Sequence, residues 1–490
     1  MCGIEATFNP KQPILRALRD MSYGDQHRGY ESAGVALYAD GMIHRYRELG
    51  KVDEAFRRIW NNAQGDDRNL FLHANVGIGQ KRYSTTGDSK VENGQPILVG
   101  KIAIGHNGNE RNVEALRERF KGKYEFSTTT DSELIGCIFD QSGDFREGAE
   151  QAFELCDGSY NLVLLNTSGQ LGVFCDPYGF QPLHFAVDGD SFYAASENSA
   201  LKYLGMKTTE MKPGQLITIS GSGNMDQNFI GPGKPSRCLI EHAYFMNPDS
   251  VFNGVLTDTV RRHVGRLVAR RYSNRIRGDI VVPVMESGIS YAYGISDELG
   301  IPVELCLAKN HDIGRTFMVP EGKDLATPEI LRLTREETAA LKHRPIPEKI
   351  RGRRIVGAED SVIRANVIKP VTRYLAESGA DAIDWLIGYM TVGHPCYYGK
   401  NHSTSAELIA AGFDDHEEAG RHIARMLSNG VPVSVNFGTL DDWVQSLKGL
   451  GAERPEESYC YACHDGKYPV LPNRGNFVSL EELRKNASII

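Results

Sequence analysis

The hydrophobic pattern of this 490-residue chain changes at a short segment rich in glycine and proline, residues 231–235. Before it, runs of β-branched and aromatic residues such as 191–195 and 215–219 are separated by Gly, Asn and Asp turns, which is typical of β-strands. Helix-like stretches lie around 13–21 and 110–120. After it, continuous apolar runs at 279–284 and 354–358 each precede a helical pattern, which predicts a parallel α/β sheet. We therefore expect a β-rich layered domain over residues 2–235 and a parallel α/β domain over residues 236–490.

The composition is that of an ordinary globular protein, with 41% hydrophobic and 24% charged residues. The formal net charge of −8 comes without long runs of one sign, so we expect small polar ligands and neither nucleic acid nor a membrane as partner. No run reaches the roughly 18 apolar residues of a membrane helix, and no signal-like stretch opens the chain. We therefore expect a cytoplasmic protein.

The number and positions of the cysteines limit the roles that they can have. Nine cysteines are too few for a disulfide scaffold in a chain of this length, so each is expected to be a core residue, a ligand or a nucleophile. Cys2 directly follows the initiator methionine. Removal of Met1 leaves a thiol and a free α-amino group on one residue, and the amine, whose pKa is ordinarily about 7.7–8.0, can accept the thiol proton. Cys2 is therefore a candidate nucleophile, although a single cysteine at this position is more often incidental.

Downstream motifs supply what hydrolysis of glutamine needs. The substrate presents a carboxylate, an ammonium group and an amide, which call for a guanidinium, a carboxylate and an oxyanion hole. Arg82, Asp131 and the pair Asn107 and Gly108 offer these groups. Each alone would be explained by a surface ion pair or a hairpin turn, so the ordered set carries the prediction.

With these motifs, residues 2–200 resemble the class II glutamine amidotransferase domain, an N-terminal-nucleophile hydrolase with an αββα sandwich fold. The resemblance implies that the site consists of catalytic Cys2, Asn107 and Gly108 and of glutamine-binding Arg28, Arg82, Thr85 and Asp131. One departure is Gln80, where the family usually has histidine.

The rest of the chain resembles the amidophosphoribosyltransferases, which implies a type I phosphoribosyltransferase fold for residues 236–470. In that family, ammonia passes to the anomeric carbon of phosphoribosyl pyrophosphate, and homo-oligomers are common. The stretches that match in order include Asp176-Pro177-Tyr178-Gly179, Lys309-Asn310, Gly314-Arg315-Thr316-Phe317, Glu359-Asp360-Ser361 and Cys396-Tyr397-Tyr398-Gly399.

The acceptor half keeps only part of that pattern. Glu359, Asp360 and Ser361 retain acidic groups for ribose hydroxyls and Mg²⁺. The family's Gly-Thr-Thr-Ser phosphate loop is replaced, and each lost bond to a phosphate costs about 1.5–3 kcal/mol. Departures also occur in two other loops. The changed residues are Ala365-Asn366-Val367-Ile368, Asn310-His311-Asp312 and Met285-Glu286.

From these departures we expect a sugar-phosphate-like or other small-molecule acceptor that differs from phosphoribosyl pyrophosphate. The family's usual phosphoribosylamine synthesis, in purine biosynthesis, is the first alternative. A glutaminase that supplies a separate protein with ammonia is a second. A non-catalytic iron–sulfur redox sensor is a third, and the intact glutamine pocket argues against it.

Cys460 and Cys463 have the spacing of metal ligands. Cys238 and Cys396 fall where the iron–sulfur subgroup of the family has its other ligands. The resemblance thus implies a [4Fe–4S] cluster, with zinc as the alternative. The remaining cysteines, expected in the core, are Cys137, Cys156, Cys175 and Cys306.

Overall fold

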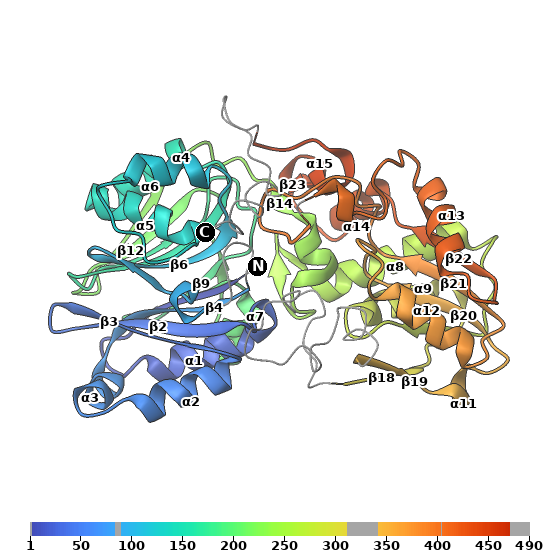
Figure 1. The fold of residues 1–490 in the computed structure, drawn as a ribbon, viewed down its shortest axis with the longest axis horizontal. Helices are drawn as coiled ribbons and strands as arrows, with labels where there is room; N and C mark the ends of the chain where they lie inside the picture. The colour runs from blue at the N-terminus through green and yellow to red at the C-terminus, as the bar shows by residue number, and fades with distance from the viewer. Residues whose placement is uncertain (1, 84–89, 311–341, 403, 471–490) are drawn as a thin grey trace.

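The computed structural model describes residues 2–83, 90–310, 342–402 and 404–470. Two antiparallel sheets form the N-terminal half (Figure 1). The first has the order β11 (Thr209–Glu210), β9 (His184–Asp188), β10 (Ser191–Ala195), β1 (Gly3–Phe8), β4 (Val76–Arg82), β2 (Ser32–Ala39) and β3 (Met42–Leu49). The second has the order β13 (Met225–Phe229), β12 (Gln215–Ile219), β8 (Leu171–Phe174), β7 (Ser159–Asn166), β6 (Ile102–Asn109) and β5 (Ile97–Val99).

Strand alternation places these sheets face to face. Ile4, Ala6 and Phe8 of β1 share one buried cluster with Ala103 of β6 and Val163 of β7, so this face of each sheet packs on the other. The outer faces are covered by helices: α1 (Leu15–Gly24), α2 (Val52–Asn62), α3 (Asp66–His73) and α7 (Asn198–Tyr203) on the first sheet, and α4 (Val113–Phe120), α5 (Asp131–Ser142) and α6 (Phe145–Leu155) on the second. The result is the expected αββα sandwich.

The C-terminal half is built on a parallel sheet in the order β17 (Ile280–Pro283), β20 (Arg354–Glu359), β21 (Ala382–Ile387) and β22 (Val433–Phe437). Buried clusters lie on both faces of this sheet, as expected for near-continuous apolar strands. The longer helices are α8 (Thr257–Tyr272), α9 (Gly288–Leu299), α12 (Ile368–Glu377), α13 (His416–Leu427) and α14 (Leu440–Gly449). In such sheets ligands bind at the carboxyl ends of the strands.

Several smaller elements lie between these helices and strands. A π-helix covers Glu241–Phe245, and residues 231–235 connect β13 to β14. The short strands pair as β14 (Arg237–Cys238) with β23 (Tyr459–Cys460), β15 (Val251–Phe252) with β16 (Val255–Leu256), and β18 (Leu307–Lys309) with β19 (His343–Pro345); the short helices are α11 (Pro347–Ile350), α15 (Pro455–Ser458) and α16 (Ala462–Asp465). Within the described ranges, no helix has both the length and the apolar character needed to cross a membrane.

Candidate active site

Cys2 precedes β1 and is only 8% exposed. Its backbone nitrogen donates to Asn107 Oδ1 on the facing sheet at 3.2 Å. Its sulfur lies 3.6 Å from the Tyr83 carbonyl oxygen and accepts from the Tyr83 N–H at 3.4 Å. The thiol and the backbone nitrogen of Cys2 are therefore both held, one by the end of β4 and the other by β6.

Asn107 and Gly108 form the part of β6 next to Cys2. Asn107 is fully buried, and its Nδ2 has no hydrogen-bond partner within the described part of the chain. A Cβ on Gly108 would lie 1.8 Å from the Ser159 carbonyl oxygen, so only glycine fits there. An unsatisfied buried N–H beside the predicted nucleophile is the arrangement expected of an oxyanion donor.

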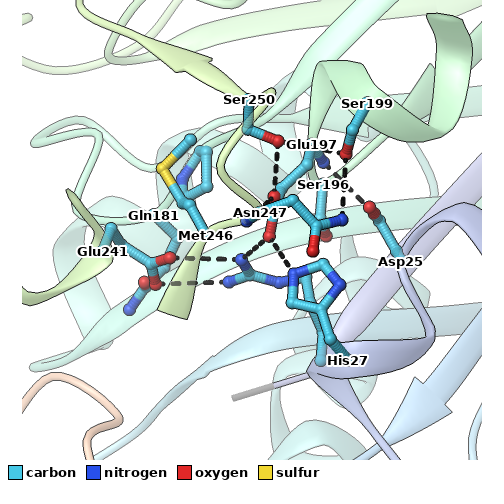
Figure 2. Close-up of polar contacts among 12 residues, drawn as sticks. Asp25, His27, Gln181, Ser196, Glu197, Ser199, Glu241, Met246, Asn247 and Ser250 are labelled. Carbon is cyan, nitrogen blue, oxygen red and sulfur yellow. Dashed lines mark hydrogen bonds and ion pairs between the residues drawn. The ribbon is translucent and has the colours of Figure 1, made fainter. Parts of the chain in front are cut away.

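Arg28 is also close to Cys2, and its guanidinium is held by several protein groups. Its Nε donates to the Cys2 carbonyl oxygen at 3.1 Å, and Nη1 lies 2.5 Å from Glu197 Oε1. Nη1 and Nη2 donate to Glu241 at 3.1 and 3.2 Å. Glu197 and Glu241 thus both pair with this fully buried guanidinium, and Figure 2 shows the two carboxylates apart from each other. These contacts hold Arg28 beside Cys2, and its role in binding glutamine stays a prediction.

Glu241 connects Arg28 to the C-terminal half. Lys400 forms an ion pair with Glu241, lies 3.4 Å from Gln181 Oε1, and has its ammonium 4.3 Å from the Phe245 ring centroid. Burial acts to raise the pKa of Glu241, but Arg28 and Lys400 together lower it to about 2. Glu241 is therefore ionised at neutral pH although it is fully buried. No local sequence pattern marks Glu197, Glu241 or Lys400, so the motifs did not predict any of the three.

Asp25, His27 and Glu197 form the one group of three potential metal-ligating side chains within 4.8 Å of one another in the described residues. Glu197 Oε1 already accepts from Arg28 and lies 2.6 Å from His27 Nε2, and its Oε2 accepts from Ser250 at 2.6 Å. Burial raises the pKa of Asp25 well above the usual carboxyl range. Ion pairs and hydrogen bonds thus account for Glu197 and His27 (Figure 2), while Oδ1 of Asp25 has no partner among the described residues.

Of the other predicted glutamine-binding residues, the structure describes Arg82 and Asp131. Arg82, at the end of β4, is almost fully buried in an ion pair with Glu31. Asp131 is the first residue of α5, and its carboxylate accepts the Glu110 N–H at 2.9 Å and lies 3.9 Å from His106 Nδ1. Thr85 lies outside the described residues.

A second candidate site lies at the carboxyl end of β20. Glu359 is its last residue, and Asp360 accepts from Ser361 Oγ at 2.5 Å and from Ser287 Oγ. Glu359 Oε2 is buried and has no partner among the described residues, and burial followed by repulsion from Asp360 raises the pKa of Glu359 well above its usual value. Glu359 and Asp360 thus form a close acidic pair in a pocket lined also by Lys342 and His343.

The loop between this acidic pair and α12 keeps a backbone shape that its sequence does not suggest. Ala365 has a φ of +58°, in the left-handed region that favours glycine. The Lys369 N–H donates to the Ala365 carbonyl oxygen at 3.0 Å, and α12 begins at Ile368. The loop therefore turns sharply into a helix N-terminus, which is the geometry that binds phosphate groups.

The four candidate ligand cysteines are all buried. Cys238 and Cys460 are directly opposite on the parallel strands β14 and β23, and Cys463 follows in α16. The Tyr398 N–H lies 3.4 Å from Cys396 Sγ. Of the other cysteines, Cys137, Cys175 and Cys306 are buried in the predicted way, whereas Cys156 is half-buried at the edge of the α5–α6 core.

These features define a glutamine amidotransferase with an N-terminal-nucleophile sandwich and a phosphoribosyltransferase-type parallel α/β domain. Residues 80–203 match the family of the glutamine amidotransferase domain. The chain is 32% identical to the amidophosphoribosyltransferases of Methanocaldococcus jannaschii and Archaeoglobus fulgidus, over 96% of this chain and 98% of each relative. The chain belongs to the amidophosphoribosyltransferase family.

Solved structures agree with that assignment. The glutamine phosphoribosylpyrophosphate amidotransferase of B. subtilis, complexed with ADP and GMP, superposes with a TM-score of 0.80 at 25% identity, over 98% of this chain and 99% of that one. A second structure, described as the allosteric regulatory enzyme of purine biosynthesis, gives a TM-score of 0.81 at 26% identity, with the same coverage. The predicted fold class is confirmed.

Proposed function

We propose that this enzyme hydrolyses glutamine at Cys2 and transfers the ammonia to phosphoribosyl pyrophosphate, giving 5-phosphoribosylamine and pyrophosphate. The observation that carries the proposal is the double role of Asn107, whose Oδ1 holds the Cys2 nitrogen while its buried Nδ2 remains without a described partner. One side chain thus fixes the candidate base and offers a donor to the charge that develops during attack.

The proposed reaction begins when Met1 is removed and the Cys2 nitrogen becomes an α-amino group. This amine takes the thiol proton, and Sγ attacks the side-chain carbonyl carbon of glutamine. Asn107 Nδ2 and the Gly108 N–H stabilise the oxyanion. The C–N bond breaks, ammonia leaves with the transferred proton, and water hydrolyses the remaining thioester to glutamate.

The relatives' names favour phosphoribosyl pyrophosphate as the acceptor over the different acceptor expected from the loop sequence. Two features at the second site support this choice. The left-handed turn at Ala365 presents a helix N-terminus to a 5′-phosphate despite the lost hydroxyl groups. Glu359 and Asp360 would hold Mg²⁺ and ribose hydroxyls, and the bound cation would supply charge neutralisation for the departing pyrophosphate.

A different acceptor remains the second candidate. The side chains that follow Ala365 are those of Asn366, Val367 and Ile368, which offer one amide in place of the family's three hydroxyl groups. A smaller or less charged phosphate ester would need fewer donors than phosphoribosyl pyrophosphate does.

One experiment separates these candidates. Anaerobically purified protein is incubated with glutamine, with and without phosphoribosyl pyrophosphate and Mg²⁺, and glutamate and pyrophosphate are measured separately. The proposal expects pyrophosphate in a 1:1 ratio with glutamate. Glutamate without pyrophosphate would instead support a different acceptor or a separate partner protein, and no glutamate under either condition would contradict hydrolysis at Cys2.

We also propose that Cys238, Cys396, Cys460 and Cys463 hold a [4Fe–4S] cluster. A tetrahedral zinc site, with Zn–S bonds of about 2.3 Å, needs its sulfurs about 3.8 Å apart. No three cysteine sulfurs among the described residues lie within 4.8 Å of one another, which favours the larger iron–sulfur cluster. Iron and acid-labile sulfide in anaerobically prepared protein, lost in Cys460→Ser and kept in Cys156→Ser, would support the proposal; zinc would overturn it.

The domain boundary belongs to the same proposal. We place it between residues 235 and 236, because residues 231–235 connect the last strand of the sandwich to β14, which pairs with the cysteine-bearing strand β23.

A further inference from the structure

Gln80 lies in β4 with a fully buried side chain, and neither its Oε1 nor its Nε2 has a hydrogen-bond partner in the described residues. It is directly opposite Ile4 of β1, which packs in the cluster between the two sheets. Opposite residues of an antiparallel pair share a face, so Gln80 also points between the sheets. A Cβ placed on Gly105 of β6 would lie 3.6 Å from the Gln80 Cβ, which confirms that the Gln80 side chain leaves its strand toward β6.

The same face carries the glutamine site. Strand alternation puts Cys2 on the face of Ile4, and Arg82 on the face of Gln80. Asn107 lies two residues beyond Gly105 on β6 and binds the Cys2 nitrogen. Gln80 is opposite Ile4, the next residue after Cys2 on this face, so it lies further between the sheets than the predicted nucleophile.

Two other buried polar atoms on this face also have no hydrogen-bond partner among the described residues. They are Nδ2 of Asn107 and Oγ of Ser32, the residue opposite Arg82 on β2. Buried polar groups are almost always satisfied by protein or by ordered water, so these unsatisfied atoms indicate a polar space between the sheets. In the proposed reaction the oxyanion accepts a hydrogen bond from Asn107 Nδ2. Gln80 and Ser32 have no role in that reaction.

We propose that Gln80, assisted by Ser32, holds the water molecule that hydrolyses the glutamyl thioester. The inference rests on the proposed role of Cys2. The nucleophile is nearly closed to solvent, yet each turnover consumes one water molecule. An amide at this depth offers that water one acceptor and one donor, and so fixes its orientation toward the carbonyl carbon.

After ammonia has left, the water oxygen attacks the thioester carbonyl carbon while the α-amine of Cys2 takes one water proton. The C–S bond then breaks, the sulfur receives that proton, and glutamate leaves. Gln80 exchanges no proton. It acts before attack by orienting the water, so its loss slows deacylation and leaves acylation intact.

The test uses the full-length protein as wild type and as Gln80→Met, which keeps side-chain length but removes both polar atoms. Steady-state glutamate release, the fraction of enzyme carrying a glutamyl thioester after acid quench, and the rate of Cys2 alkylation by a glutamine-like chloromethyl ketone are measured. We expect glutamate release to fall about 10- to 100-fold, the thioester to become the main enzyme form, and alkylation to change less than about twofold.

Two further variants and one reagent make the result specific. Gln80→His returns a donor and an acceptor and is expected to recover part of the rate. Thr7→Val is the matched control, because Thr7 Oγ1 is also buried without a described partner but alternates with Ala6 and Phe8, away from the inter-sheet space. Added hydroxylamine is expected to restore turnover of Gln80→Met as γ-glutamyl hydroxamate, since this nucleophile replaces the oriented water.

Three results would overturn the proposal: no thioester in Gln80→Met, alkylation slowed as much as glutamate release, or the same loss in Thr7→Val. If Gln80→Met does not fold, Ser32→Ala carries the test, with a smaller fall in release and the same gain in thioester expected. Wild-type protein that releases no glutamate would overturn the proposed function itself, and this inference with it.

Discussion

Glu241 accepts hydrogen bonds from both terminal nitrogens of Arg28, a residue 213 positions earlier in the chain. Arg28 in turn donates to the carbonyl oxygen of Cys2. Since Lys400 of the C-terminal half holds the same carboxylate, the predicted nucleophile is positioned through residues of both halves. The surroundings of the predicted nucleophile therefore include side chains from the C-terminal half of the chain.

The first prediction concerns this connection. Glu241→Gln keeps the shape but removes a charge that two buried cations share, so we expect the free energy of unfolding to fall by about 3–5 kcal/mol and glutamate release to fall as well. Thermal unfolding and glutamine kinetics measure the two effects. A variant with unchanged glutamate release would show that Arg28 does not need Glu241 to hold Cys2.

The sequence predicted a β-rich half and a parallel α/β half because strand and helix periodicities are local, whereas the αββα arrangement followed from the resemblance to a known family. It also singled out Asn107 and Gly108, which lie together in one motif on β6 and next to Cys2. It could not find Glu197, Glu241 and Lys400, because a buried carboxylate or amine is recognised by its partner, and these partners lie 159 to 213 residues away. The contacts of Arg28 with Glu197 and Glu241 are equally distant in sequence, so a motif does not show them.

The second prediction separates the two reactions. Cys2→Ala removes the nucleophile, so glutamate release should fall at least about a thousand-fold. The second site is untouched, and externally added ammonium salt at high pH should still give pyrophosphate from phosphoribosyl pyrophosphate. Coupled pyrophosphate detection measures this. Residual glutamate release near the wild-type rate would contradict the assignment of Cys2.

A third prediction uses Glu110, which lies beside Asp131. Burial raises its pKa to about 7, although three backbone N–H groups that bind Oε1 act to lower the pKa. The folded state thus keeps a proton that the unfolded chain releases near pH 4.5. This contribution to stability is complete below about pH 4.5 and is lost as pH rises through about 7, by about 3 kcal/mol.

Glu110→Gln tests that linkage, because the amide is neutral at every pH. Urea unfolding at pH 5, 6, 7 and 8 should show a smaller decline in stability for the variant than for the wild type. A parallel decline in the two proteins would mean that Glu110 titrates alike in the folded and unfolded states.

The last prediction concerns the turn at Ala365. A left-handed alanine costs about 1–2 kcal/mol, which Ala365→Gly would relieve. The variant would also lose the burial of one methyl group, about 0.8 kcal/mol, and gain chain entropy in the unfolded state of similar size. These effects nearly cancel, so we expect little change in Tm. Ala365 also lines the pocket of Glu359 and Asp360; if a phosphate binds against this backbone, removal of the methyl group should lower KM for phosphoribosyl pyrophosphate several-fold. Ala365→Val, with a β-branched side chain at the same φ, should lower Tm and raise KM. If Ala365→Gly leaves KM unchanged, the methyl group does not limit phosphate binding, and the missing hydroxyl groups after it do.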